Sequence, residues 1–110
     1  MNKNKIIAVD FDGTLAEEKY PYIGQPNLKL INKLISCRKN GDKVILWTCR
    51  DSTELESAIN WCRDYGLEFD AINDNIPEVV EAWQSNPRKI FANVYIDDKN
   101  KLVKKWQEDI

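Results

Sequence analysis

The residues best suited to chemistry in this chain are acidic, and they stand at the ends of apolar runs. Asp10 and Asp12 close the first such run, and the adjacent pair Asp97 and Asp98 closes the last. Carboxylates that are packed together repel one another unless a cation neutralises them. Oxygen ligands without His or Cys suit a hard ion such as Mg²⁺, and the chain contains no His. If the fold brings the two acidic groups together, the sequence predicts a Mg²⁺ site.

Four short runs rich in Val, Ile and aromatic residues predict the strands that would carry these groups. The runs occupy residues 5–10, 43–48, 68–72 and 92–97. The first of them, directly after the N-terminus, is far too short to span a bilayer.

Apolar residues between these runs recur at helical spacing and predict a helix in each interval. The first two helices are expected to stop at Gly41 and Gly66, and a third is expected over residues 77–84. A last helix is expected over residues 99–107. The side chains expected to lie in the core are Leu28, Ile31, Leu34, Ile35, Trp47, Leu55, Ala58, Ile59, Trp61, Cys62, Val79, Val80, Trp83, Leu102, Val103 and Trp106.

Strands that alternate with helices predict right-handed crossovers and a mostly parallel sheet with helices on both faces. A chain of 110 residues suffices for one domain, so the predicted fold is a single three-layer α/β domain over residues 1–110. In such sheets, ligands bind outside the carboxyl ends of the strands. The acidic groups would share that edge with Thr48, Cys49 and Arg50, which end or follow the second run.

Composition limits the partners of this domain. Sixteen basic and eighteen acidic residues give a formal charge of -2, so no overall field attracts nucleic acid or an anionic membrane. Three Cys without a CxxC pair predict neither a disulfide framework nor a zinc site. The apolar run near the N-terminus is too short for a secretory signal. We therefore expect a cytoplasmic protein without a membrane partner, and an oligomer is compatible with these features.

The strand-end motifs resemble those of the haloacid dehalogenase (HAD) superfamily of phosphohydrolases. VDFDGT is similar to the first motif of that family, an apolar strand followed by Asp-x-Asp-x-Thr, and VILWT resembles the second, a strand that ends on Thr or Ser. VYIDD resembles the acidic fourth motif, and Lys89, with Arg88 as a neighbouring candidate, matches the third. The resemblance implies a Rossmann-like, HAD-like fold and Mg²⁺-dependent hydrolysis of phosphomonoesters.

The resemblance also gives each catalytic residue a role. Asp10 would be the nucleophile that forms an aspartyl-phosphate, and Asp12 would protonate the leaving group and later activate water. Thr48 would bind phosphoryl oxygens, and Lys89 would add positive charge as charge spreads in the transition state. Gly13 would relieve the steric limits on the turn that carries Asp12.

The implied metal ligands are Asp10, the backbone carbonyl of Asp12, and the Asp97–Asp98 pair. Alignment with the fourth motif suggests that Asp98 binds the ion and Asp97 supports it, and the reverse assignment is open. The hydroxyl of Thr14 would brace the turn after the first strand by hydrogen bonding.

Residues beside these motifs are candidates for substrate binding. Arg50 would clamp a substrate phosphate bidentately, or it would pair with Asp51 or cap the following helix. Cys49 would border the substrate or pack as a small hydrophobe. Asn73 and Asp74 would line the pocket or only form a turn.

The intervals in which HAD proteins insert a cap domain are short here, which indicates a capless protein. The expected substrate is a phosphorylated small molecule or nucleotide, or a 3'-phosphorylated nucleic-acid end. The interval from Gly13 to Asn27 is long enough for a flap, in which Tyr20 and Tyr22 would stack on a base or pack the flap onto the sheet. The alternatives are transfer to an acceptor other than water, a receiver-like phosphoacceptor domain modified on Asp70, and a non-catalytic phosphate-binding module.

Overall fold

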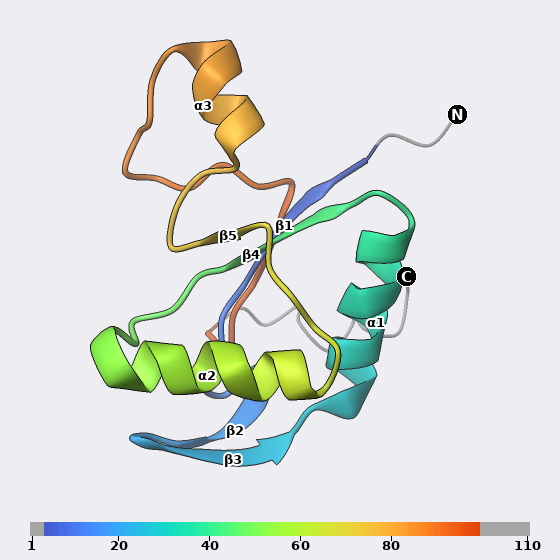
Figure 1. The fold of residues 1–110 in the computed structure, drawn as a ribbon, viewed down its shortest axis with the longest axis vertical. Helices are drawn as coiled ribbons and strands as arrows, with labels where there is room; N and C mark the ends of the chain where they lie inside the picture. The colour runs from blue at the N-terminus through green and yellow to red at the C-terminus, as the bar shows by residue number, and fades with distance from the viewer. Residues whose placement is uncertain (1–3, 100–110) are drawn as a thin grey trace.

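A parallel sheet of four strands forms the centre of the molecule (Figure 1). The computed structural model describes residues 4–99. The strands are β1 (Ile6–Val9), β4 (Lys43–Leu46), β5 (Ala71–Ile72) and β6 (Val94–Ile96), in the order β5-β4-β1-β6. All four predicted strands are confirmed, although β5 is shorter than the run that predicted it.

Three helices connect these strands. They are α1 (Leu28–Lys39), α2 (Ser52–Asp64) and α3 (Pro77–Trp83). Asn27 caps α1, because its side-chain oxygen accepts a hydrogen bond from the Leu30 N–H at 3.2 Å. Gly41 and Gly66 follow the ends of α1 and α2, and Pro77 occupies the first turn of α3. The predicted helix positions are confirmed for this part of the chain.

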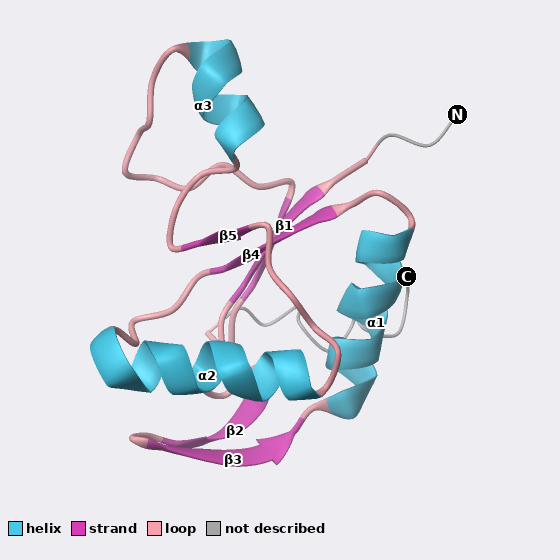
Figure 2. Cartoon of the chain, in the orientation of Figure 1, coloured by secondary structure: helices cyan, strands magenta, loops and turns pink. Residues whose placement is uncertain are grey.

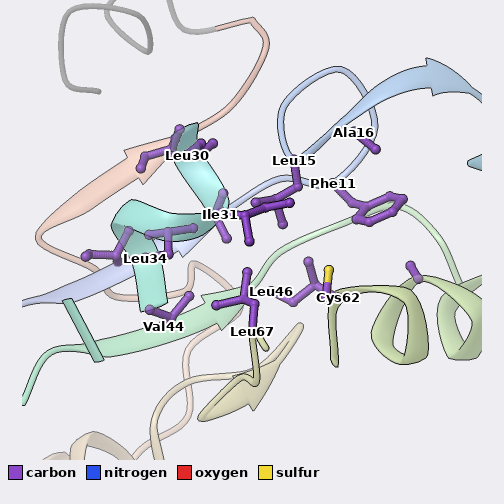
Figure 3. Packing of buried hydrophobic residues seen from close by; sticks show 14 of the residues in the cluster. Phe11, Leu15, Ala16, Leu30, Ile31, Leu34, Val44, Leu46, Cys62 and Leu67 are labelled. Atoms are coloured by element: carbon purple, nitrogen blue, oxygen red, sulfur yellow. The ribbon is translucent and has the colours of Figure 1, made fainter. Parts of the chain in front are cut away.

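Side chains that alternate along β1 divide the core into two layers. Ile7 and Val9 are buried in one cluster with residues of α1 and α2, several of which are labelled in Figure 3. Ala8 belongs to a second cluster on the opposite face, with Ile76 and with Val79 of α3 packed against it. Full burial of one large apolar side chain stabilises a fold by roughly 1.5–3 kcal/mol. The sheet is therefore held by apolar packing on both faces, as predicted.

The strand order reverses beside β1. The chain runs from β1 outward to β4 and then to β5, with α1 and α2 as the connections. After α3 it returns to place β6 on the other side of β1. The carboxyl ends of β1 and β6 therefore form the topological switch point, where open α/β sheets bind ligands.

A two-stranded antiparallel hairpin follows β1 and was not predicted. It consists of β2 (Ala16–Lys19) and β3 (Tyr22–Pro26), and Figure 2 shows it as a separate magenta ribbon near α2. Three of the four side chains of β2 are exposed, so the segment lacks the apolar alternation that identifies a strand.

Several core predictions are wrong. Leu28 is 49% exposed because it is the first residue of α1, and Leu30 takes the inward position instead. Trp83 is 50% exposed because α3 buries no residue fully, and Trp47 is 38% exposed because it follows the end of β4.

The helix predicted over residues 99–107 lies, apart from Lys99, outside the described residues, together with Leu102, Val103 and Trp106. Among the described residues, no helix combines the length and apolar character needed to cross a membrane.

Candidate functional site

Three aspartates meet at the topological switch point. Asp10 follows β1, and Asp97 and Asp98 follow β6. The Asp10 N–H donates a hydrogen bond to the Ile96 carbonyl at 2.8 Å, which holds the two strand ends together. One carboxylate oxygen from each aspartate lies within 4.8 Å of the other two. The structure thus brings Asp10 together with the Asp97–Asp98 pair as predicted, whereas Asp12 is paired with Arg50 and is not part of this cluster.

The surroundings of Asp10 raise the pKa of its carboxyl group. Burial, followed by the charges of Asp97, Asp98 and Asp12, raises the pKa of Asp10 to about 7, against the lowering effect of a hydrogen bond from the Phe11 N–H. The carboxyl group is therefore in an environment that disfavours its negative charge. A cation bound among these oxygens would remove that penalty, and an all-oxygen donor set suits a hard divalent ion.

Gly13 allows the loop after β1 to lie against Asp98. Its φ is +81°, and a Cβ added there would come within 2.7 Å of Asp98 Oδ2. Any larger residue would strain the backbone and displace that carboxylate. The predicted need for glycine is confirmed, with close approach to Asp98 as a further reason.

Thr14 does not brace this turn through its hydroxyl. The side chain is buried, and Oγ1 has no hydrogen-bond partner among the described residues. The turn is closed by backbone bonds instead, in which the Thr14 N–H donates to the Phe11 carbonyl and the Gly13 N–H to the Ala16 carbonyl. The predicted role of the hydroxyl is therefore wrong.

Thr48 stands beside the cluster at the end of β4. Its N–H donates to Asn73 Oδ1 at 2.8 Å, and its Oγ1 accepts from the Arg50 N–H at 3.1 Å. The Asn73 side chain therefore helps to hold the loop that carries Thr48. Asp74 accepts bonds from the Asn75 N–H and from Asn86, so these residues form the turn that was one of the two expectations for them.

Lys99 follows the acidic pair directly and interacts with both of its members. Its N–H donates to Asp97 Oδ1 at 2.8 Å, and its Nζ lies 3.4 Å from Asp98 Oδ2. The pKa of Asp98 is lowered, first by a hydrogen bond with the Asp97 carboxyl and then by the charge of Lys99. Lys99 was not among the predicted site residues, although its position next to the acidic pair was a usable signal.

A cleft of about 480 Å³ opens over these groups. Its lining comprises Asp10, Asp12, Glu18, Tyr20, Thr48, Cys49, Arg50, Asp98 and Lys99. Glu18 and Tyr20 come from the hairpin, which therefore forms one wall. Glu18 was not selected from the sequence, because nothing local marks it as near β1.

Lys89 does not lie in this cleft. It lines a different pocket, whose other residues are Trp83, Pro87, Phe91, Ala92 and Tyr95. The basic residues that line the cleft, among those described, are Arg50 and Lys99. The prediction that Lys89 lies beside the aspartates is therefore wrong, because the segment between α3 and β6 places Lys89 in the other pocket.

Arg50 binds Asp12 rather than Asp51. Its Nε donates to Asp12 Oδ2 and its Nη2 to Asp12 Oδ1, each at 2.8 Å. Nη1 also donates to the Glu54 carbonyl at 3.3 Å. Neither a free phosphate clamp nor a pair with Asp51 is observed.

The cysteines have different environments. Cys49 is exposed in the cleft lining, so it borders the ligand space and does not pack as a hydrophobe. Cys62 is buried, and burial raises the pKa of its thiol to about 12. Such a thiol is inert at neutral pH.

Asp70 lies at the opposite end of the sheet. It precedes β5, and its carboxylate accepts bonds from Arg38 and from the N–H of Val44, at the start of β4. A phosphoacceptor at this position would lack the acidic cluster, so the receiver-like alternative loses its structural basis.

No family model and no curated protein match the chain. A solved structure does match: a conserved protein from Bacteroides thetaiotaomicron, which is 35% identical in sequence with a TM-score of 0.81. The alignment covers 98% of this chain and 93% of the other. The likeness thus extends over almost the whole of both proteins, the strand ends included.

Proposed function

We propose that this chain, which belongs to the same family as the conserved Bacteroides thetaiotaomicron protein, is a Mg²⁺-dependent phosphomonoester hydrolase of the HAD type. One observation carries the proposal. Asp10, with a pKa raised to about 7, lies in a cluster with Asp97 and Asp98 at the topological switch point of a parallel sheet. A carboxylate placed in this way suits attack on an anionic ester once a cation offsets the repulsion.

The three clustered aspartates fit Mg²⁺ by donor type. Their oxygens lie within 4.8 Å of one another, and carboxylate oxygens are the usual protein ligands of this ion. Asp10 and Asp98 would hold it, with the Asp12 carbonyl as a further ligand and Asp97 in support. When bound, the ion would neutralise the cluster and the substrate's phosphoryl oxygens.

In the first half-reaction, Asp10 attacks phosphorus. A bond forms between one Asp10 carboxylate oxygen and phosphorus, and the bond to the alcohol oxygen breaks. Asp12, which also lines the cleft, enters this step protonated, with the proton on a lone pair that its two bonds from Arg50 leave open, and gives that proton to the departing oxygen. The products are an alcohol and an aspartyl-phosphate.

In the second half-reaction, water attacks the aspartyl-phosphate. Asp12 takes a proton from the water, the bond between phosphorus and Asp10 breaks, and inorganic phosphate leaves. Transfer to another acceptor would follow the same course with an alcohol in place of water.

Thr48 and Lys99 bind the transferred phosphoryl group in this proposal. Thr48 offers its hydroxyl from the loop that Asn73 holds, and Lys99 brings its ammonium group to the same cleft. Lys99 takes the charge-stabilising role that the family resemblance implied for Lys89. Loss of one contact of this kind costs about 100- to 1,000-fold in rate in enzymes where it has been measured.

The cleft favours a substrate that does not need enclosure. Within the described residues, the hairpin is the only element inserted between β1 and α1, and it supplies Glu18 and Tyr20 to one wall. Phosphorylated small molecules and nucleotides fit such a site, and so does a phosphorylated nucleic-acid end. Tyr20 is exposed and can stack on a base.

A phosphoester panel tests the function. p-Nitrophenyl phosphate, nucleotides, sugar phosphates and 3'-phosphorylated oligonucleotides are incubated with the protein in Mg²⁺ and in EDTA. We expect release of inorganic phosphate from at least one class in Mg²⁺ only.

Two substitutions serve as a matched pair in the same assay. Asp10→Asn is expected to remove turnover, whereas Asp70→Asn, at the opposite end of the sheet, is expected to retain it. Equal turnover by Asp10→Asn and the unaltered protein would refute the proposal. Binding of phosphate esters without turnover would favour a non-catalytic module.

A further inference from the structure

Arg50 is a buried cation whose hydrogen-bonding capacity is filled by the protein. The residue is 2% exposed. A guanidinium group has five N–H donors, and Arg50 makes two side-chain bonds to Asp12 and three to backbone carbonyls. The carbonyl acceptors are those of Pro21, Tyr22 and Glu54.

These partners come from three separate parts of the fold. Asp12 belongs to the loop after β1, Pro21 and Tyr22 to the β2–β3 hairpin, and Glu54 to the first turn of α2. The guanidinium carbon also lies over two aromatic rings, 4.9 Å from the centroid of Phe11 and 5.1 Å from that of Tyr20. Both rings add attraction to the cation.

A buried charge is costly unless it is paired and fully hydrogen-bonded. Arg50 meets both conditions, so its arrangement is specific. A substrate phosphate could bind this guanidinium only by breaking bonds that already exist. The contacts therefore indicate that Arg50 acts on other protein groups rather than on the substrate.

We propose that Arg50 is a positioning residue, which fixes the Asp12 carboxylate at the cleft and locks the hairpin in place as a rigid wall. The role for Asp12 rests on the proposed hydrolase function. The bidentate pair defines the plane of the Asp12 carboxylate, and the bonds to Pro21 and Tyr22 attach the hairpin to the same guanidinium. Asp12 and the hairpin therefore hold their positions together.

A double-mutant cycle tests the link to Asp12. Arg50→Ala, Arg50→Lys and Asp12→Asn are made singly, and each Arg50 change is combined with Asp12→Asn. We expect Arg50→Ala to lower kcat/KM for an alkyl phosphate by roughly 10- to 100-fold, within the range of general acid catalysis. In the Asp12→Asn background the further loss should be less than about threefold, because coupled residues are not additive.

The leaving group gives a second readout. 2,4-Dinitrophenolate departs without protonation, so loss of a positioned acid affects its ester less than an alkyl ester. We expect the Arg50 variants to show a larger loss with glycerol phosphate than with 2,4-dinitrophenyl phosphate. Full additivity in the cycle, or equal losses with both esters, would overturn the link to Asp12.

Arg38→Ala is the matched control. Arg38 makes a bidentate pair with Asp70 at the opposite end of the sheet. Its removal should lower stability without changing the ratio of the two kcat/KM values. A change in that ratio would show that general destabilisation, rather than Asp12, explains the Arg50 result.

Hydrogen exchange tests the hairpin without any need for activity. In Arg50→Ala, amides of residues 16–26 should exchange at least about tenfold faster, while those of β1 and β4 keep their protection. If Arg50→Ala does not fold, Arg50→Lys decides, since Lys cannot reproduce the planar fork. Unchanged hairpin exchange in the folded variant would refute the locking role. A protein that is inactive on every ester but shows the exchange effect would refute the hydrolase function alone.

Discussion

Asp10 shows how one side chain can oppose the stability of the fold that carries it. Its pKa is raised to about 7 by burial and by three neighbouring carboxylates, so without a cation its ionised form destabilises the native state at neutral pH. We expect Asp10→Asn to raise the thermal unfolding midpoint in EDTA, because Asn keeps the shape without the charge. A gain of about 1 kcal/mol in the free energy of unfolding raises the unfolding midpoint by roughly 4 °C in a domain of this size.

Asp70→Asn provides the opposite case. Although burial works against it, the Arg38 guanidinium and the Val44 N–H hold the pKa of Asp70 below its ordinary value. Its charge therefore stabilises the fold, and Asp70→Asn should lower the midpoint. If both variants shift in the same direction, the destabilising role of Asp10 is wrong.

Lys99 and Lys89 offer a direct comparison of two candidate cations. Lys99 lines the cleft with Asp10, and Lys89 lines a different pocket. We expect Lys99→Ala to lower kcat/KM by roughly 10- to 100-fold, because it removes a charge that stabilises the transition state. Lys89→Ala should stay within about threefold. The reverse order, measured with one substrate in Mg²⁺, would return the role to Lys89.

The residues that sequence could locate are those fixed by strand ends. Asp10, Thr48 and Asp98 each close or follow a buried run, and parallel pairing brings such ends to one edge of the sheet. Lys89 does not lie at the end of a strand. Its position in the sequence, eight residues before Asp97, does not determine on which side of the sheet its side chain lies. The pairing of Arg50 with Asp12 could not be predicted either, because the two residues are 38 positions apart and no sequence pattern links them.

At the scale of elements, the β2–β3 hairpin is held by a close backbone approach. A Cβ added at Gly24 in β3 would come within 2.6 Å of the Glu17 carbonyl oxygen in β2. We expect Gly24→Ala to destabilise the hairpin by about 1–3 kcal/mol, as overpacking does elsewhere. Hydrogen exchange of residues 16–26 measures the effect, and faster exchange should be confined to that segment.

Gln25→Ala is the matched change for this prediction. Gln25 is exposed on the same strand, so its truncation should leave hairpin exchange nearly unchanged. Similar protection in Gly24→Ala and Gln25→Ala would mean that the strands can separate to admit the extra methyl group without loss of pairing.

The elements differ in how far sequence could predict them. α1 and α2 carry apolar stripes with glycines at their ends, and both were predicted. β2 exposes three of its four side chains, so no burial pattern marks it, and the Arg50 guanidinium contacts the hairpin at the Pro21 and Tyr22 carbonyls, beyond the end of β2. β5 has only two paired residues, although Asp70 before it also bonds to Val44 of β4 through its N–H and its carboxylate.

At the scale of the whole molecule, the β5-β4-β1-β6 order places the acidic cluster at the carboxyl ends of the adjacent strands β1 and β6. β1 contributes to apolar layers on both faces of the sheet, so Asp10 follows a strand whose side chains Ile7, Ala8 and Val9 are fully buried. The alternation of strands and helices was sufficient to predict this architecture. A carboxylate whose charge is disfavoured, at the end of a buried strand, is the arrangement expected of a functional site, where function is obtained at some cost in stability.

The stability of the molecule should therefore depend jointly on pH and Mg²⁺. The pKa of Asp10 is 3.8 in the unfolded chain and about 7 in the folded one, so between these values the native state holds more protons than the unfolded state. Stability in EDTA should then fall as pH rises from about 4 to about 7, with no further change from this group above that range. Asp70, with its lowered pKa, loses its stabilising effect only at more acidic pH.

Mg²⁺ should reverse this trend where Asp10 is ionised. A ligand that binds only the native state stabilises it by about 2.7 kcal/mol at a hundred times its Kd, and protons compete for the Asp10 oxygens. We expect the urea midpoint to rise with Mg²⁺ at about pH 8 and to change little at about pH 5. Asp10→Asn should flatten the pH dependence in EDTA and weaken the Mg²⁺ effect. A Mg²⁺ effect of equal size at both pH values, or one that survives unchanged in Asp10→Asn, would show that the ion binds away from the cluster.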